Sequence, residues 1–285
     1  MKITKKVAVA AVVGACVSVQ GGASIAKMLL PLIGPGGAVL LRIGFAGLIL
    51  SLFHRPPWRS FTKAQWGCIL FYAFSIAAMN ASFYCGVGRV PLGVAVTIEF
   101  TGPLVLALVR SRSVKDILWA LLAALGIGLI VPWHKGFGEG AVDPIGVGFV
   151  ALAGLMWAFY IVATDRIAGR VKNADAICSG MLFAALFVLP FGIFSGVFTQ
   201  LTPHVLWLGL GIAVFSSALP FTLDLLSLNS LPGKTFGVLQ SLQPAIAALS
   251  GFCFLGEKLT WTQWFAILCI MASSTGATLT TKTKN

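Results

Sequence analysis

The sequence predicts an all-α membrane protein with ten transmembrane helices arranged as two inverted five-helix repeats. Three observations predict this fold: an extremely apolar composition, a regular series of apolar runs, and an internal repeat. Of the 285 residues, 58% are hydrophobic and 10% are charged, whereas soluble domains carry about 25% charged residues. A chain of this size cannot bury so much apolar surface in water, so we predict a multi-pass membrane protein.

Ten apolar runs approach the length of about 20 residues that a helix needs to cross the hydrocarbon core. We predict these spans at 7–30, 36–53, 66–86, 91–109, 116–134, 144–164, 175–196, 205–223, 234–254 and 261–280. The first run follows Lys2, Lys5 and Lys6, as in a signal peptide. It is longer than a signal peptide's apolar region and no cleavage site follows it, so we interpret it as a retained span.

Lys and Arg are distributed unequally between the two sides of the predicted bundle. Fifteen fall on the side of the two termini, and only Lys27, Arg89, Lys135 and Lys258 fall on the other side. Cytoplasmic loops carry the excess of basic residues in membrane proteins. We therefore predict both termini in the cytoplasm, and we assign the net charge of +12 to membrane orientation rather than to nucleic-acid binding.

The chain repeats itself with a shift of 141 residues. The matching pairs are Trp66 with Trp207, Ser75 with Ser216, Pro91 with Pro232, Pro103 with Pro244, and Asp116 with Glu257. The two repeats, residues 5–134 and 143–281, each contain five predicted spans. Because five is odd, the second repeat enters the membrane in the opposite sense. Inverted repeats are typical of secondary transporters, whose substrate site lies near the bilayer midplane.

Patterns of catalytic and metal sites are nearly absent from the sequence. It contains no His-Glu-x-x-His, no Gly-x-Ser-x-Gly and no phosphate-binding Gly-x4-Gly-Lys motif, so we predict no catalytic residues, no cofactor and no metal. The six cysteines lie in apolar runs without Cys-x-x-Cys spacing, and we interpret them as small buried side chains. Active transport would then depend on an ion gradient or on the gradient of the substrate.

Polar and aromatic residues within the spans are the candidate substrate-binding residues, because polar groups in lipid face the bundle interior or a cavity. They are Gln20, Gly21, Gly22, Ser24, Arg42, Asn80, Glu99, Trp157, Tyr160, Gln240 and Gln243. We expect a central cavity lined by the first, third, fourth, sixth, eighth and ninth spans. Other interpretations stay open: close helix packing for the glycines, snorkelling for Arg42, and packing for the aromatic residues.

Glu99 lies near the middle of the apolar run 91–109, roughly 12 Å from the end that starts at Pro91. A carboxylate at this depth costs about 2.5–3.5 kcal/mol on insertion scales, so it needs a partner, a proton or water. Arg42, at a similar depth, is the candidate ion-pair partner. Alternatively, Glu99 exchanges a proton and couples transport to a proton gradient. The sequence leaves both roles open.

Seven segments spread along the whole chain resemble the EamA-type drug/metabolite transporter superfamily, and most closely the bacterial inner-membrane threonine/homoserine exporters. They are Gln20–Lys27, Val90–Gly93, Glu99–Leu104, Ala218–Phe221, Leu231–Pro232, Thr235–Gly237 and Phe254–Glu257.

The resemblance implies efflux of small amino acids such as threonine and homoserine across the bacterial inner membrane, with proton exchange as the expected coupling. Arg42 or Lys27 would bind the substrate carboxylate, and Glu99 with Gln20 or Gln240 would bind its ammonium group. The expected partners are this small molecule and membrane lipid, without nucleic acid, and a homodimer is one state that the sequence allows. An exporter of another metabolite or drug is the main alternative. A membrane-embedded enzyme acting on lipid and a channel are less favoured.

Overall fold

The computed structural model describes residues 4–110, 115–130, 143–228 and 230–280. Every regular element within these residues is helical, which confirms the predicted all-α class. The α-helices are α1 (Lys5–Phe53), α2 (Lys63–Val87), α3 (Leu92–Glu99), α4 (Thr101–Arg110), α5 (Lys115–Ile130), α6 (Pro144–Ile167), α7 (Asn173–Phe194), α8 (Pro203–Ala213), α9 (Leu219–Leu228), α10 (Gly233–Gln240), α11 (Gln243–Leu255) and α12 (Trp261–Thr280). Short 3₁₀ turns occupy Trp58–Ser60 and Val197–Thr199.

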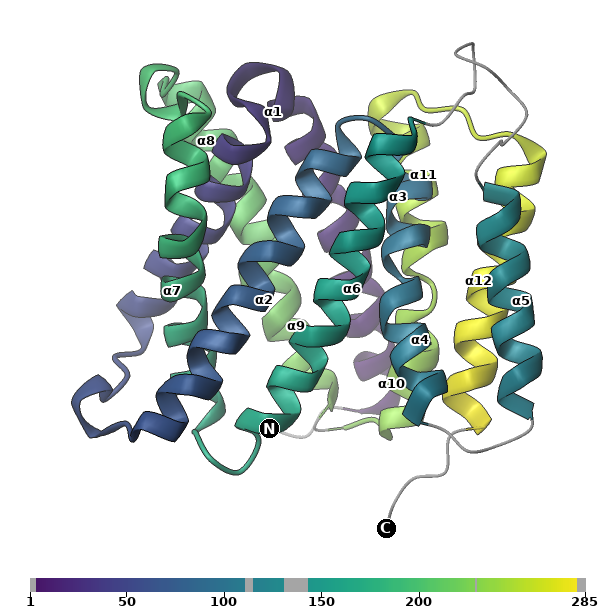
Figure 1. Cartoon of the computed structure of the whole chain (residues 1–285), viewed down its shortest axis with the longest axis horizontal. Coiled ribbons are helices and arrows are strands. Elements are labelled where there is room, and N and C mark those ends of the chain that lie inside the picture. The colour runs from purple at the N-terminus through teal and green to yellow at the C-terminus, as the bar shows by residue number, and fades with distance from the viewer. Residues whose placement is uncertain (1–3, 111–114, 131–142, 229, 281–285) are drawn as a thin grey trace.

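The helices stand side by side in one bundle, with α7 and α8 at one end of the row and α5 with α12 at the other (Figure 1). Helix α1 contacts α2, α7, α8, α9, α10 and α11, so it connects most of the bundle. The largest remaining contacts join α2 to α6 and α5 to α12. Helix α1 begins and helix α12 ends at the same end of the bundle (Figure 1).

The outer surface of the bundle is strongly apolar. Leu52, Phe194 and Trp261 are 81%, 89% and 90% exposed, and many other large apolar side chains share this exposure. Contiguous apolar surface of this kind is unfavourable in water and suits contact with lipid. Six segments are long and apolar enough to cross a membrane: α1, α2, Leu92–Arg110, α6, α7 and Thr235–Leu255. Shorter apolar helices cover Ile117–Leu129 and Pro203–Ala218, which overlap two further predicted spans.

Helix α1 contains both of the first two predicted spans, and the expected connection between them is mostly helical. The two parts are separated at Gly34, whose φ of +67° lies in the left-handed region that glycine adopts without strain. Pro35 follows directly and cannot continue the hydrogen bonding of the first part. The chain therefore turns back within a few residues, without a loop.

The predicted spans 91–109, 205–223 and 234–254 are not the continuous helices that the sequence analysis expected. The first is interrupted at Phe100, the second by the π-helical turn Val214–Ala218, and the third at Ser241 and Leu242. Each interruption lies just before a proline: Pro103, Pro220 or Pro244. Proline has no N–H, so it cannot bond the carbonyl four residues earlier, and these carbonyls belong to Glu99, Ser216 and Gln240.

The interruption at Phe100 is packed tightly against α6. A Cβ atom added to Gly102 would overlap the backbone of Gly154, and one added to Gly154 would press on the carbonyl of Glu99. The backbones of α4 and α6 can approach this closely only because both positions are glycine. This crossing fixes the position of Glu99 relative to α6.

Candidate substrate-binding site

Arg42 lies in the second part of α1, and its side chain reaches the interruption between α8 and α9. Its Nη2 donates a hydrogen bond of 3.2 Å to the carbonyl of Ser216. That carbonyl is available because residue 220 is proline. The guanidinium carbon lies 5.8 Å from the ring centroid of Tyr84. Because Tyr84 and Ser216 are buried, Arg42 points into the bundle and does not snorkel to the lipid headgroups.

Glu99 ends α3 and is half-buried. The ion pairs among the described residues do not include it, so the direct pair with Arg42 that the sequence allowed is not formed. The two side chains are nevertheless close enough for their charges to interact. Phe100 packs edge-on against Trp157 at 5.4 Å between ring centroids, which places Trp157 of α6 beside the interruption.

Three buried polar atoms in this part of the bundle lack a hydrogen-bond partner among the described residues: Gln20 Oε1, the Tyr84 hydroxyl and Ser216 Oγ. Gln20, Tyr84 and Ser216 are 2%, 1% and 4% exposed. Leaving such an atom unsatisfied costs about 1–3 kcal/mol, so it indicates a place that water or a ligand occupies. Gly22 packs directly against Ser216, so α1 closes this region from one side.

A chain of amide hydrogen bonds connects α1 to α9, α10 and α11. Gln20 Nε2 donates to Gln243 Oε1 at 3.3 Å, Gln243 Nε2 donates to Gln240 Oε1, and Gln240 Nε2 donates to Asp224 Oδ1 at 3.4 Å. The thiol of Cys16 also donates to Gln240 Oε1. The i, i+3 spacing of Gln240 and Gln243 therefore brings their side chains into contact. The structure joins three of the predicted site residues here.

Other predicted site residues have partners within the protein. Ser24 Oγ shares a hydrogen bond of 2.8 Å with Ser250 Oγ, and Asn80 Nδ2 donates at 2.9 Å to the carbonyl of Ile76 in its own helix. The Tyr160 ring lies 5.2 Å from that of Tyr72. A Cβ atom on Gly21 would meet no atom within 4 Å, so Gly21 borders open space. The substrate-binding roles of the eleven residues stay predictions.

Lys27, the other candidate for the substrate carboxylate, is already paired. Its Nζ donates at 2.6 Å to Glu257 Oε1 and at 2.6 Å to the carbonyl of Val90. The second oxygen of Glu257 accepts the N–H of Leu92, at the start of α3, at 2.7 Å. We call Lys27, Val90, Leu92 and Glu257 the Lys27 cluster. It joins α1 and α3 to the segment after α11, so Lys27 has a structural partner that the sequence analysis missed.

Asp224 is a second residue that the sequence analysis did not place at the site. It accepts hydrogen bonds from Gln240, and its charge is close enough to interact with Tyr160. It lies just after the predicted span 205–223, where a carboxylate can be solvated, so its position gave no signal of a partner inside the bundle. Among the described residues, no three His, Cys, Asp or Glu side chains come together as metal ligands.

An all-helical bundle with an apolar surface and charged groups in its interior is the architecture of a multi-pass membrane protein. The chain belongs to the EamA-like transporter family, whose match covers residues 144–279. It is 43% identical over 269 residues to the threonine/homoserine exporter RhtA of Escherichia coli (strain K12), which covers 94% of this chain and 90% of that protein. It is 43% identical over 264 residues to the threonine/homoserine exporter RhtA of Salmonella typhimurium (strain LT2), covering 92% and 88%. This confirms the resemblance found in the sequence.

A solved crystal structure shares the fold. It superposes with a TM-score of 0.63 over 97% of this chain and 98% of its own, at 14% sequence identity. At this identity the likeness concerns the fold alone.

Proposed function

We propose that the protein is a secondary exporter of small amino acids, threonine and homoserine among them, across the bacterial inner membrane. The observation that carries this proposal is the 43% identity, over nearly the full length of both chains, to proteins named as threonine/homoserine exporters. The unpaired polar atoms around Arg42 add support, because they provide hydrogen-bonding capacity in the interior that the protein itself does not use.

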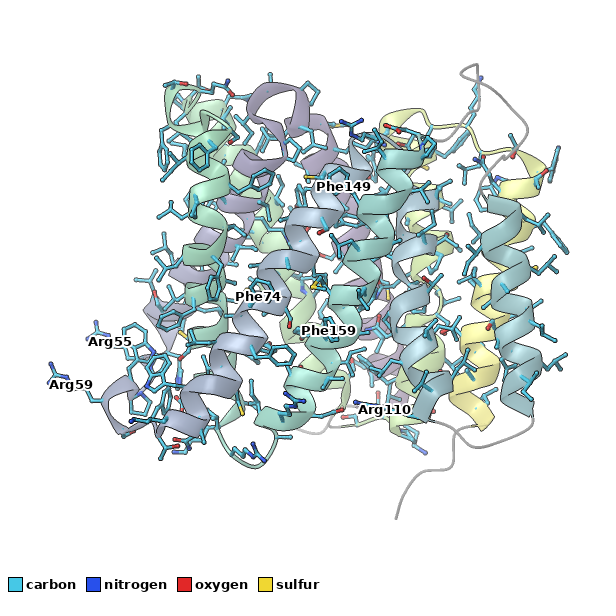
Figure 2. All side chains as sticks on the ribbon, in the orientation of Figure 1. Arg55, Arg59, Phe74, Arg110, Phe149 and Phe159 are labelled. Atoms are coloured by element: carbon cyan, nitrogen blue, oxygen red, sulfur yellow. The ribbon has the colours of Figure 1, made fainter. Side chains whose placement is uncertain are left out.

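The proposed architecture is ten spans in two inverted repeats, residues 5–134 and 143–281, with both termini in the cytoplasm. The helix interruptions that follow Glu99 and Gln240 support it, because these two residues occupy equivalent positions of the two repeats, four residues before Pro103 and Pro244. An even number of crossings agrees with the beginning of α1 and the end of α12 lying at one end of the bundle (Figure 1). Arg55, Arg59 and Arg110 also lie at that end (Figure 2), as expected for a cytoplasmic face.

The chemistry of a zwitterion fits the groups around Arg42. A guanidinium has five N–H donors, and Arg42 makes one hydrogen bond in the described residues, so it can bind the substrate carboxylate. Glu99, when deprotonated, carries the opposite charge, and Gln20 Oε1 is a free acceptor, so both can bind the ammonium group. Lys27 is not a proposed substrate ligand, because it is already ion-paired with Glu257. Amino acid and lipid are the proposed partners; the homodimer stays a prediction.

Proton exchange is the proposed coupling, with Glu99 as the group that gains and loses the proton. When the substrate is absent, Glu99 has no direct cationic partner among the described residues, so a proton can neutralise it. When a substrate ammonium arrives, the deprotonated form is favoured. The proton and the substrate ammonium would then exclude one another at Glu99, which is the requirement for exchange.

Transport in proteoliposomes tests both parts of the proposal. The protein should exchange threonine for threonine, and an imposed pH gradient should drive net threonine movement. Glu99→Gln keeps size and hydrogen bonding but cannot titrate, so we expect exchange to persist and pH-driven movement to fall at least about tenfold. Asp165→Asn, which changes an exposed carboxylate paired with Arg110, is the matched control and should behave as wild type.

Two results would contradict the proposal in different ways. If neither threonine nor homoserine exchanges while another metabolite or drug does, the substrate assignment is wrong. If threonine exchanges but Glu99→Gln retains the full response to the pH gradient, the substrate stands and the coupling role of Glu99 is wrong.

A further inference from the structure

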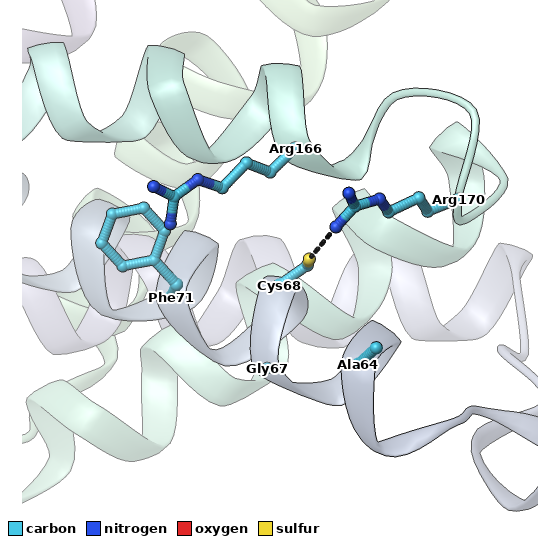
Figure 3. Close-up of a pocket in the computed structure, with 6 residues that line it drawn as sticks. All are labelled: Ala64, Gly67, Cys68, Phe71, Arg166 and Arg170. Carbon is cyan, nitrogen blue, oxygen red and sulfur yellow. Dashed lines mark hydrogen bonds between the residues drawn. The ribbon is translucent and has the colours of Figure 1, made fainter.

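A pocket of about 320 Å³ lies between α2 and the end of α6, and none of the residues that line it belongs to the chain of amide hydrogen bonds described above. Ala64, Gly67, Cys68 and Phe71 of α2 form its floor, and Arg166 and Arg170 extend across it (Figure 3). We call it the arginine pocket. A Cβ atom added to Gly67 would meet no atom within 4 Å, so Gly67 faces open space.

Both arginines of the pocket present donors without a strong acceptor. The Arg166 guanidinium carbon stands 5.3 Å from the ring centroid of Phe71, and Arg170 Nη1 lies 3.6 Å from Cys68 Sγ, a weak acceptor (Figure 3). Neither arginine belongs to an ion pair among the described residues, because the neighbouring Asp165 pairs with Arg110 at 2.7 Å. Two guanidinium forks over one hollow match an oxyanion such as a phosphate.

The backbone around the pocket holds these donors in place. Gln65 Nε2 donates at 2.7 Å to the carbonyl of Arg170, which ties the turn after α6 to the first turn of α2. The Arg166 guanidinium lies over the ring of Phe71, and this cation–π contact favours its position at the pocket. The donors are therefore directed over the pocket by contacts on both elements, unlike Arg55 and Arg59, which project away from the bundle (Figure 2).

An apolar strip leads from the pocket along the outside of α2 and α6. Phe71 contacts Phe159 at 6.3 Å between centroids, and Leu70, Phe74 and Phe159 are 38%, 52% and 42% exposed. Phe74 and Phe159 lie further toward the middle of the bundle than the arginine-bearing end (Figure 2). A phosphate at the arginines would thus place an acyl chain against these aromatic rings.

We propose that the arginine pocket binds the headgroup of an anionic phospholipid, with one acyl chain along Leu70, Phe74 and Phe159. Basic pockets between helices at the membrane boundary recognise such headgroups. The joined apolar strip favours a lipid over a free anion, because a soluble phosphate would gain nothing from exposed phenylalanines. This inference stands independently of the transported substrate.

The test is lipid binding to the purified full chain in detergent, counted by native mass spectrometry with phosphatidylglycerol and phosphatidylcholine as probes. Wild type should bind phosphatidylglycerol about tenfold more tightly than phosphatidylcholine. Arg166→Gln with Arg170→Gln should remove this preference. Arg55→Gln with Arg59→Gln removes the same charge from the same end and should keep the preference within about twofold.

A second variant separates geometry from charge and guards against misfolding. Arg166→Lys with Arg170→Lys keeps both charges but loses the planar forks, so the preference should fall about threefold while the gel-filtration profile stays that of wild type. Excess inorganic phosphate should leave the bound lipid in place.

Three outcomes would overturn the proposal. If Arg55→Gln with Arg59→Gln loses the preference for phosphatidylglycerol as fully as Arg166→Gln with Arg170→Gln does, the lipid is attracted to the basic face as a whole. An unchanged preference in the lysine variant would mean that the pocket's geometry plays no part. Displacement of the lipid by phosphate, with no preference left between the two lipids, would identify a site for free anions.

Discussion

Lys27 and Arg42 lie on the same helix, α1, one before and one after Gly34, yet their hydrogen-bond partners in the bundle differ. Lys27 has a carboxylate at 2.6 Å and a carbonyl at 2.6 Å, and both oxygens of its partner Glu257 are occupied. Arg42 has one hydrogen bond of 3.2 Å to a backbone carbonyl, beside buried polar atoms without partners. A satisfied cation holds helices together, whereas an unsatisfied one is available to a ligand.

The largest expected effect is on stability, from Glu257→Ala. This change leaves Lys27 without its carboxylate and the N–H of Leu92 without its acceptor, and breaking such a pair costs about 3–5 kcal/mol when it is buried. Both side chains keep some exposure, so we expect the lower part of this range. The measurement is the free energy of unfolding in detergent micelles.

A double variant shows whether the loss comes from the unpaired charge. Lys27→Met combined with Glu257→Leu removes both charges and should be more stable than Glu257→Ala alone. If the double variant is less stable than Glu257→Ala, the Lys27 cluster contributes through packing and the comparison with Arg42 fails.

The second effect concerns transport and belongs to Arg42→Gln. Loss of a charge-assisted hydrogen bond to the substrate costs about 1.5–3 kcal/mol, which corresponds to roughly a tenfold to hundredfold weaker threonine affinity. The free energy of unfolding should change by less than about 1 kcal/mol, because Arg42 makes one long hydrogen bond within the described residues. Threonine counterflow and unfolding are measured on the same preparation.

Arg110→Gln is the matched control for Arg42→Gln, because it removes the same kind of charge from an exposed pair with Asp165. Its threonine affinity should equal that of wild type. A large loss of stability in Arg42→Gln with unchanged affinity would place Arg42 in the same structural class as Lys27.

The sequence predicted much of the helical content but not which cation would be free. Lys27 and Glu257 are 230 residues apart, so no local pattern reveals that they meet. Gln240 and Gln243 are three residues apart, a spacing that predicts one shared face, and they stay in contact although the helix is interrupted between them at Ser241 and Leu242. Local spacing is therefore readable from the sequence, whereas partners across the two halves depend on how the bundle packs.

The interruptions of the helices could have been predicted and were not. Pro103, Pro220 and Pro244 lie inside predicted spans, and each removes one helical hydrogen bond. The sequence does not show which donors bond the released carbonyl groups. Arg42 donates a hydrogen bond to the carbonyl of Ser216 only because the second part of α1 packs against α8 and α9.

The smallest expected effect comes from an ion pair outside the membrane region, between Arg89 and Asp143 at 2.8 Å. The hydrogen bond from Arg89, together with the N–H of Ile145, holds the pKa of Asp143 below its ordinary value. A carboxyl with a lowered pKa stabilises the fold above its unfolded pKa of about 3.9, and this contribution disappears as the pH falls through the folded value.

Asp143→Asn should therefore flatten the loss of stability below about pH 4 and change little at pH 7, because the pair is exposed to solvent. Melting temperatures of wild type and Asp143→Asn across this acidic range measure the difference. If Asp143→Asn lowered the melting temperature at pH 7 as much as Glu257→Ala does, partial burial would not be the property that makes the Lys27 cluster strong.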